Sequence, residues 1–317
     1  MTAFTRILLL CFLANPAFAQ DTTRFRPFPD SNNVLSYMGV WHTSFSAGST
    51  TGAFSHQPRL QANTSAYLGA TLTYKWFSIF IAMNIPQTSV LKGRDKEVRA
   101  SQIEVSHWWN QWGVESVYQH DRGLLEQDRE GKVNSVWQWV DYKYVGFNAT
   151  YFFSPHHFSY AAADNFSRLQ TRNGGSFMAM LTPSWQNFSF QKSSLDTTLS
   201  DINLYNLISR NANHLALLGK VGYSYAFVWK EGRWTCSPLF CVGPGVDVSP
   251  KYSPLLGYQG RLTAGYNGGK WYAYVSGLYD FTSEPQKNLG LKTINESASL
   301  SVGYRFHSMK HRILGLL

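Results

Sequence analysis

The chain lacks long apolar runs beyond its N-terminus, and it has few charges. Charged residues make up 15% of its 317 residues, against about 25% in an ordinary soluble domain. Without an apolar stretch of about 18 residues in the mature part, a helical membrane protein is excluded. Aromatic residues make up 16% of the chain, which excludes a disordered chain. The chain is therefore an ordered protein that is rich in aromatic residues and has no membrane-spanning helices.

The first residues have the pattern of an export signal. A short basic region precedes an apolar core at 7–13, and Ala17-Phe18-Ala19 supplies the small-x-small cleavage pattern. We expect cleavage before Gln20, which makes 1–19 a signal peptide. A lipoprotein signal at Cys11 is the alternative, although the small residues that should precede the cysteine are missing.

The formal net charge is +9, but Lys and Arg are scattered singly. Scattered basic residues without a binding motif do not indicate a nucleic-acid partner, and export argues against one. A modest positive excess fits a protein among anionic lipid headgroups. We therefore expect outer-membrane lipids as partners, no nucleic acid and no cofactor.

Alternation of apolar and polar residues dominates the mature chain. In 298–306 every even position is apolar and every odd position is small or polar, and 68–76 and 215–227 repeat the pattern. Many such segments are near ten residues long with aromatic residues at their ends, which is typical of strands that cross a bilayer. Because only a closed barrel satisfies every strand hydrogen bond in lipid, we predict an all-β, antiparallel transmembrane β-barrel. A soluble β-sandwich, whose strands also alternate, is the alternative.

The connections alternate between short and long, which predicts the number of strands. Six short turns and seven long links imply fourteen strands with both termini in the periplasm. The weakest strand is 188–196, and twelve strands is the alternative. The short turns are expected near Trp76, Asn110, Ser154, Gln186, 231–232 and 268–269, and the long links at about 48–65, 87–97, 123–138, 168–173, 197–212, 248–254 and 283–292.

This pattern also divides the chain. We expect a periplasmic segment at 20–34, one barrel domain at 35–306 and a periplasmic tail at 307–317. The alternating, aromatic-ended last strand resembles the signal that the outer-membrane insertion machinery recognises in barrel families, which makes that machinery an expected partner. Its signal positions are Leu300, Val302, Tyr304 and Phe306.

One block of the chain matches a known pattern in register, at Phe158, Ser159, Tyr160, Asn165, Ser167, Gln170, Gly175 and Ser176. With 69–76 and 146–151, this block resembles a domain-of-unknown-function family of Bacteroidota outer-membrane β-barrel proteins. Asp164 and Asn173 depart from the family pattern. The resemblance implies an outer-membrane barrel and carries no established chemistry.

Several polar residues are expected to face the lumen by alternation. We interpret them as an interior polar network, with a pore or a ligand cavity as the functional alternative. Glu104 and Glu115 are expected on adjacent strands of one hairpin, where such a pair supports acid–base chemistry or meets a lumen arginine. The lumen residues are Glu104, Glu115, Asn148, Lys220, Gln259, Arg261 and Arg305.

His42 and Ser44 are weak catalytic candidates. His42-Thr43-Ser44 resembles the His-x-Ser pair of outer-membrane phospholipase and lipid A deacylase families, and a serine nucleophile needs a base within hydrogen-bond reach. The Asn-Gly that follows in those families is replaced by Phe45-Ser46. We expect the face with Tyr37, Trp41 and Phe45 to meet lipid, which turns His42 and Ser44 inward and argues against catalysis.

Cys236 and Cys241 are candidates for a disulfide in an oxidising compartment. On a straight strand they lie about 16 Å apart, whereas a bridge needs Cα atoms within about 7 Å, so the chain would have to fold back around Pro238. No Cys or His stands nearby for a zinc site, and the adjacent His156 and His157 diverge on a strand, so we expect no metal.

Together these features predict an outer-membrane barrel that acts as a non-enzymatic channel or a structural component. A lipid-modifying hydrolase that uses His42 and Ser44 is the alternative. The sequence leaves the oligomeric state open.

Overall fold

The computed structural model describes residues 24–28, 32–48, 59–62, 66–74, 77–85, 88–89, 99–127, 132–190, 213–248, 252–284 and 290–306. The expected signal peptide at 1–19 and the tail at 307–317 lie outside these residues. No helix in the described part of the chain is long and apolar enough to cross a bilayer.

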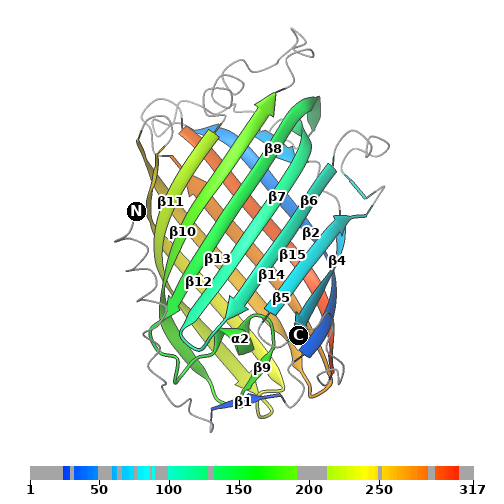
Figure 1. Cartoon of the computed structure of the whole chain (residues 1–317), viewed down its shortest axis with the longest axis vertical. Coiled ribbons are helices and arrows are strands. Elements are labelled where there is room, and N and C mark those ends of the chain that lie inside the picture. Colours follow the sequence, from blue (N-terminus) through cyan, green and yellow to red (C-terminus); the bar gives the residue numbers. More distant parts are fainter. Residues whose placement is uncertain are drawn as a thin grey trace, which may run out of the picture.

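Within the described residues, twelve antiparallel strands close into a barrel (Figure 1). Each strand pairs with the next along the chain, and the last strand closes the ring on the first, from Gly290 opposite Gly48 to Phe306 opposite Asn32. The strands are β2 (Asn32–Gly48), β4 (Ala66–Tyr74), β5 (Phe77–Asn84), β6 (Arg99–Trp108), β7 (Trp112–Gln127), β8 (Val133–Phe152), β10 (Gly174–Phe190), β11 (Asn213–Trp229), β12 (Trp234–Asp247), β13 (Ser253–Asn267), β14 (Trp271–Ser283) and β15 (Gly290–Phe306).

A short strand narrows one end of the barrel. β3 (Arg59–Ala62) lies between β2 and β7 at the end away from the short turns. Nearer the short turns, β4, β5 and β6 separate the same two strands. One strand thus takes the place of three, and the ring is narrower at the end that carries the long connections.

The outer face carries an apolar belt. Large apolar side chains are exposed on every strand of the ring, and exposed aromatic residues gather near the short turns, including Trp112, Trp229, Trp234, Trp271 and Tyr304. An exterior of this size and composition needs lipid to cover it. The predicted transmembrane β-barrel is therefore confirmed.

The predicted number of fourteen strands is wrong, and the alternative of twelve is right. The segment between the turn expected near Ser154 and the link expected at 168–173, which the count of fourteen makes a strand, forms turns and the helix α2 (Tyr160–Ala163). Its three alanines favour helix over strand. The turn expected at Gln186 does not form, since β10 runs through it to Phe190. The link expected at 123–138 is mostly strand, with only 128–132 between β7 and β8.

The assignment of the two faces of β2 was also wrong. Tyr37 and Phe45 are buried inside the barrel, while Met38 and Val40 are exposed on the belt. Tyr37 lies flat against Phe80 of β5, with ring centroids 4.7 Å apart. The aromatic face is therefore the inner face, where its rings pack against rings from other strands.

A small plug covers the short-turn end of the barrel. It is formed by the connection between β8 and β10, which contains α2 and β9 (Arg168–Gln170), and by β1 (Phe25–Pro27), which pairs with β9. Figure 1 shows these elements together across the lower end of the ring. Within the segment expected in the periplasm at 20–34, Phe25–Pro27 therefore contribute to the plug, and the residues from Asn32 contribute to the barrel wall.

Candidate functional site: a polar chamber in the barrel

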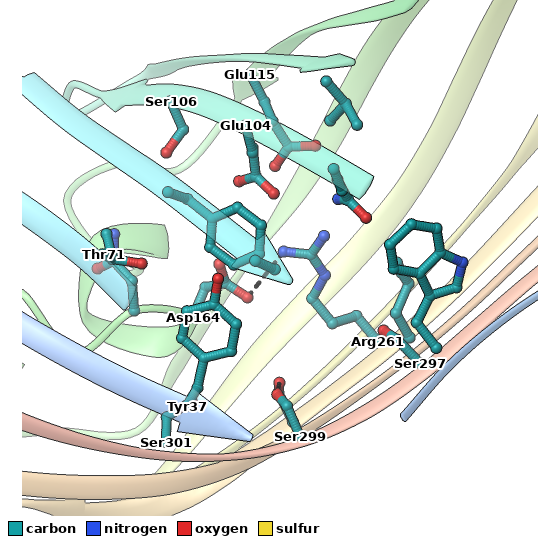
Figure 2. A pocket seen from close by; sticks show the side chains of 18 of the residues that line it. Tyr37, Thr71, Glu104, Ser106, Glu115, Asp164, Arg261, Ser297, Ser299 and Ser301 are labelled. Carbon is teal, nitrogen blue, oxygen red and sulfur yellow. Dashed lines mark hydrogen bonds and ion pairs between the residues drawn. The ribbon is translucent and has the colours of Figure 1, made fainter. Parts of the chain in front are cut away.

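A polar chamber of about 300 Å³ lies inside the barrel between the plug and the narrow end. Its wall is made by strands from both halves of the ring, and its floor includes Asp164 and Asn165 of the plug. Figure 2 shows carboxylates, hydroxyls and one guanidinium facing the same space. The chamber has the size of a small ligand pocket.

The floor is tied to the wall by Arg261 of β13. Its guanidinium donates to Asp164 at 3.0 Å and to the Tyr160 hydroxyl at 2.7 Å. Tyr160 packs on Trp108, with ring centroids 4.3 Å apart, and burial raises the pKa of its hydroxyl well above the usual value. Tyr160 therefore stays neutral, and Asp164 supplies the negative partner of Arg261.

The block that resembles the family pattern builds this plug. The Ser159 amide donates to the Gln170 side chain at 3.2 Å, and the Ser167 amide donates to Asn165 at 3.1 Å. The Ser154 amide donates to Ser176 Oγ at 2.9 Å, which joins the plug to the start of β10. These residues hold a loop in shape and do not form a reactive constellation.

Glu104 and Glu115 form an acidic wall above Arg261. They come from β6 and β7, neighbouring strands of one hairpin, and both carboxylates face the guanidinium (Figure 2). Glu115 accepts a hydrogen bond from Asn148 at 2.9 Å, and Asn148 accepts one from Thr182 at 2.8 Å. The two carboxylates of this hairpin therefore share the chamber with an arginine of the opposite wall.

Lys220 and Asp280 form a second polar group at the wall. The Lys220 ammonium lies 3.5 Å from Asp280 and donates to Gln259 at 3.3 Å. Glu104, Glu115, Asp164 and Asp280 line the chamber together with Arg261, and the Lys220 ammonium contacts Asp280 at the wall. Carboxyl groups outnumber the basic groups here, which favours a cation over an anion.

The other end of the chamber is closed by an apolar seal. The cluster packs Phe45, Trp137, Tyr142 and Phe188 against Leu60 and Leu291, all buried. Phe45 meets Tyr142 and Phe188 edge-on, with centroids 4.8 and 5.0 Å apart. Because β3 narrows the barrel at this level, aromatic side chains of strands that are not neighbours, β2 and β10, meet across the lumen.

The structure brings most of the lumen residues together around the chamber. Arg305 lies apart from it, under the plug. His42 and Ser44 alternate along β2 with Trp41 and Thr43, which line the chamber, so they belong to the opposite side of the strand. Cys236 and Cys241 are both free thiols on one continuous strand, so the disulfide does not form. Leu300, Val302 and Tyr304 are exposed on the outer face of β15, which ends at Phe306.

Asp164 and Asp280 were missed as chamber residues, and Tyr160 was missed as a hydrogen-bond partner of Arg261. Tyr160 and Asp164 lie in the plug, where alternation along a strand carries no information. Asp164 did leave a signal, because it departs from the family-like pattern in the block that builds the floor. Asp280 lies on β14 and Lys220 on β11, two strands that are not neighbours, so the sequence does not predict their contact.

Three solved barrels are similar to this chain. The translocator domain of the autotransporter NalP from Neisseria meningitidis is 12% identical, with 96% of this chain and 94% of that chain covered and a TM-score of 0.35. The β-domain of the Bordetella autotransporter BrkA is 10% identical, with 85% and 99% covered and a TM-score of 0.38. OmpT of Vibrio cholerae, an outer-membrane protein, is 6% identical, with 87% and 98% covered and a TM-score of 0.31. The barrel assignment rests on the strand pairing and the outer belt.

No curated protein matches the chain. A family model does, over residues 20–306, which include the whole ring and the plug. The match agrees with the resemblance to an uncharacterised domain family, and nothing in it concerns the source organism. The chain belongs to the DUF4421 family, a domain of unknown function.

Proposed function

We propose that the protein is an outer-membrane barrel that acts as a gated channel for small polar solutes, with a preference for cations. The observation that carries the proposal is the polar chamber between two closures. A barrel with a purely structural interior has no need of a cavity of about 300 Å³ whose walls carry an excess of carboxylates. The export signal and the lipid belt support the outer membrane as its location, with lipids and the insertion machinery as partners.

The two closures differ in kind. The plug is held to the wall by charged hydrogen bonds from Arg261, whereas the narrow end is closed by packed rings. Hydrophobic constrictions close channels by excluding water, and rings of carboxylates select cations. In this scheme the seal gates, the plug limits the size of the solute, and Glu104 and Glu115 set the charge preference.

Planar bilayers test this proposal. We expect the wild type to pass little current, and a variant with Trp137→Ala and Phe188→Ala in the seal and Tyr160→Phe and Asp164→Asn in the plug to conduct roughly tenfold more or better. Reversal potentials in a salt gradient should show cation preference. Adding Glu104→Gln and Glu115→Gln should reduce that preference without closing the pore.

The seal pair alone and the plug pair alone serve as controls, since the closure that remains intact should keep the current low. Heat-dependent gel mobility shows that each variant is folded. If the combined variant is folded and passes no more current than the wild type, the interior is a packed structural network and the channel proposal is wrong.

A lipid-modifying hydrolase is the second candidate, because alternation with Trp41 and Thr43 turns His42 and Ser44 away from the chamber. Ser44 is buried, however, and its hydroxyl has no hydrogen-bond partner among the described residues. The hydrogen bond that would activate a serine is therefore missing. We expect purified protein not to cleave phospholipid or lipid A. Cleavage by the wild type that Ser44→Ala abolishes would establish the hydrolase instead.

A further inference from the structure

Three buried side chains with metal-binding groups meet at the narrow end of the barrel, apart from the chamber residues discussed above. His214 stands at the start of β11, Asp247 ends β12 and Glu284 follows β14. Their exposed fractions are 2%, 1% and 7%. One potential ligand atom from each lies within 4.8 Å of the other two.

The contacts converge on one nitrogen of the imidazole. His214 Nδ1 contacts Asp247 Oδ2 and lies 3.8 Å from Glu284 Oε1. The other nitrogen, Nε2, is buried and has no hydrogen-bond partner among the described residues. A histidine that is buried for structural reasons satisfies both nitrogens. Among the described residues, the imidazole of His214 therefore has polar contacts only at Nδ1, with the two carboxylates.

The backbone holds the three residues in place. The amide of Val248, next to Asp247, donates to the carbonyl of Leu215, next to His214, at 2.8 Å. The Glu284 amide donates to the Leu291 carbonyl at 3.1 Å across the β14–β15 connection. Both hydrogen bonds lie one residue or less from the cluster, so its geometry is set by the sheet before any ligand arrives.

We propose that His214, Asp247 and Glu284 bind one divalent transition-metal ion, with Zn²⁺ as the best fit. One imidazole nitrogen and two carboxylate oxygens form a mixed donor set that suits Zn²⁺, whereas Ca²⁺ and Mg²⁺ prefer oxygen ligands alone. When both carboxylates are ionised and the imidazole is neutral, the cluster carries two negative charges, which a divalent cation balances. Burying those charges unbalanced is costly.

The metal site would stabilise the narrow end of the barrel, a role that is independent of the proposed channel. A metal ion here links β11, β12 and the β14–β15 connection at the end where the long connections leave the barrel. It would brace the wall beside the apolar seal, since Leu291, the partner of the Glu284 amide, belongs to that cluster. Bound metal should therefore stabilise the folded barrel.

Sequence spacing gave no signal of this site, and no metal was expected. His214 and Asp247 are 33 residues apart, and Glu284 is on a third segment. Strand order alone brings them together, because the end of one antiparallel strand is beside the start of the next. The adjacent His156 and His157, which look more like a metal motif, are exposed at the opposite end.

Zn²⁺ titration of the full chain in detergent micelles, after chelation and dialysis, tests the site. We expect one Zn²⁺ per chain by elemental analysis and calorimetry, and a higher midpoint of thermal unfolding when Zn²⁺ is present. His214→Gln, Asp247→Asn and Glu284→Gln should each weaken Zn²⁺ binding by more than about tenfold, because even the loss of an outer partner costs about 10–100-fold.

The matched control is His156→Gln with His157→Gln, which removes an exposed histidine pair and should leave the affinity unchanged. Heat-dependent gel mobility identifies the variants that fold, and the three substitutions are close to isosteric, so at least one is expected to fold. Absence of Zn²⁺ binding by the wild type would overturn the proposal. So would binding that the control abolishes, or binding that every folded cluster variant retains.

Discussion

Arg305→Met is expected to lower the free energy of unfolding by about 3 kcal/mol or more, because buried acceptors that lose their donor cost about 1–3 kcal/mol each. Arg305 is 1% exposed. Its guanidinium donates to the carbonyls of Phe166 and Gly268, and to the side chain of Asn267 at 2.7 Å. One side chain thus joins the last strand, the β13–β14 turn and the plug.

Two aromatic rings enclose the same guanidinium. The Phe28 and Tyr272 ring centroids lie 3.6 and 4.2 Å from its central carbon, and methionine would keep only the apolar part of these contacts. Urea unfolding in micelles, followed by tryptophan fluorescence, measures the change. Arg233→Met is the control, since Arg233 is an exposed arginine at the same end of the barrel, and we expect almost no effect. Equal losses from both substitutions would contradict the role given to Arg305.

Phe45→Ala is expected to cost about 3–5 kcal/mol, the range for removing a buried ring from a packed core. The Phe45 side chain is 0% exposed and packs edge-on against Tyr142 and Phe188 in the seal. The narrow ring at β3 leaves little room to collapse around the missing side chain. The same unfolding measurement applies.

Met38→Ala on the same strand is the matched control. Met38 is 54% exposed on the lipid belt, so its truncation loses contact with lipid and leaves no cavity. We expect a cost well below that of Phe45→Ala. A larger cost for Met38→Ala would mean that the two faces of β2 are exchanged, as the sequence pattern alone had suggested.

The sequence by itself was enough to predict a closed antiparallel barrel. Alternation with period two is a local property of each strand, and export without apolar helices leaves one way to cross a membrane. The same alternation led to the choice of Glu104, Glu115 and Arg261 as lumen residues. It did not decide which face of β2 is inside, because rings are apolar enough for lipid and large enough to fill a narrow lumen.

The tertiary structure alone decided the number of strands, the plug and the meeting of His214, Asp247 and Glu284. Gln186 is compatible with a turn or a strand, and only its ladder with β8 and β11 makes it strand. The helix at Tyr160–Ala163 is too short to be stable alone, and contacts such as that of Arg261 with Asp164 hold it in the barrel. His214 and Asp247 meet only across a strand pair. Each of these features depends on residues far apart in the chain, and local patterns hold no information about which distant residues become neighbours.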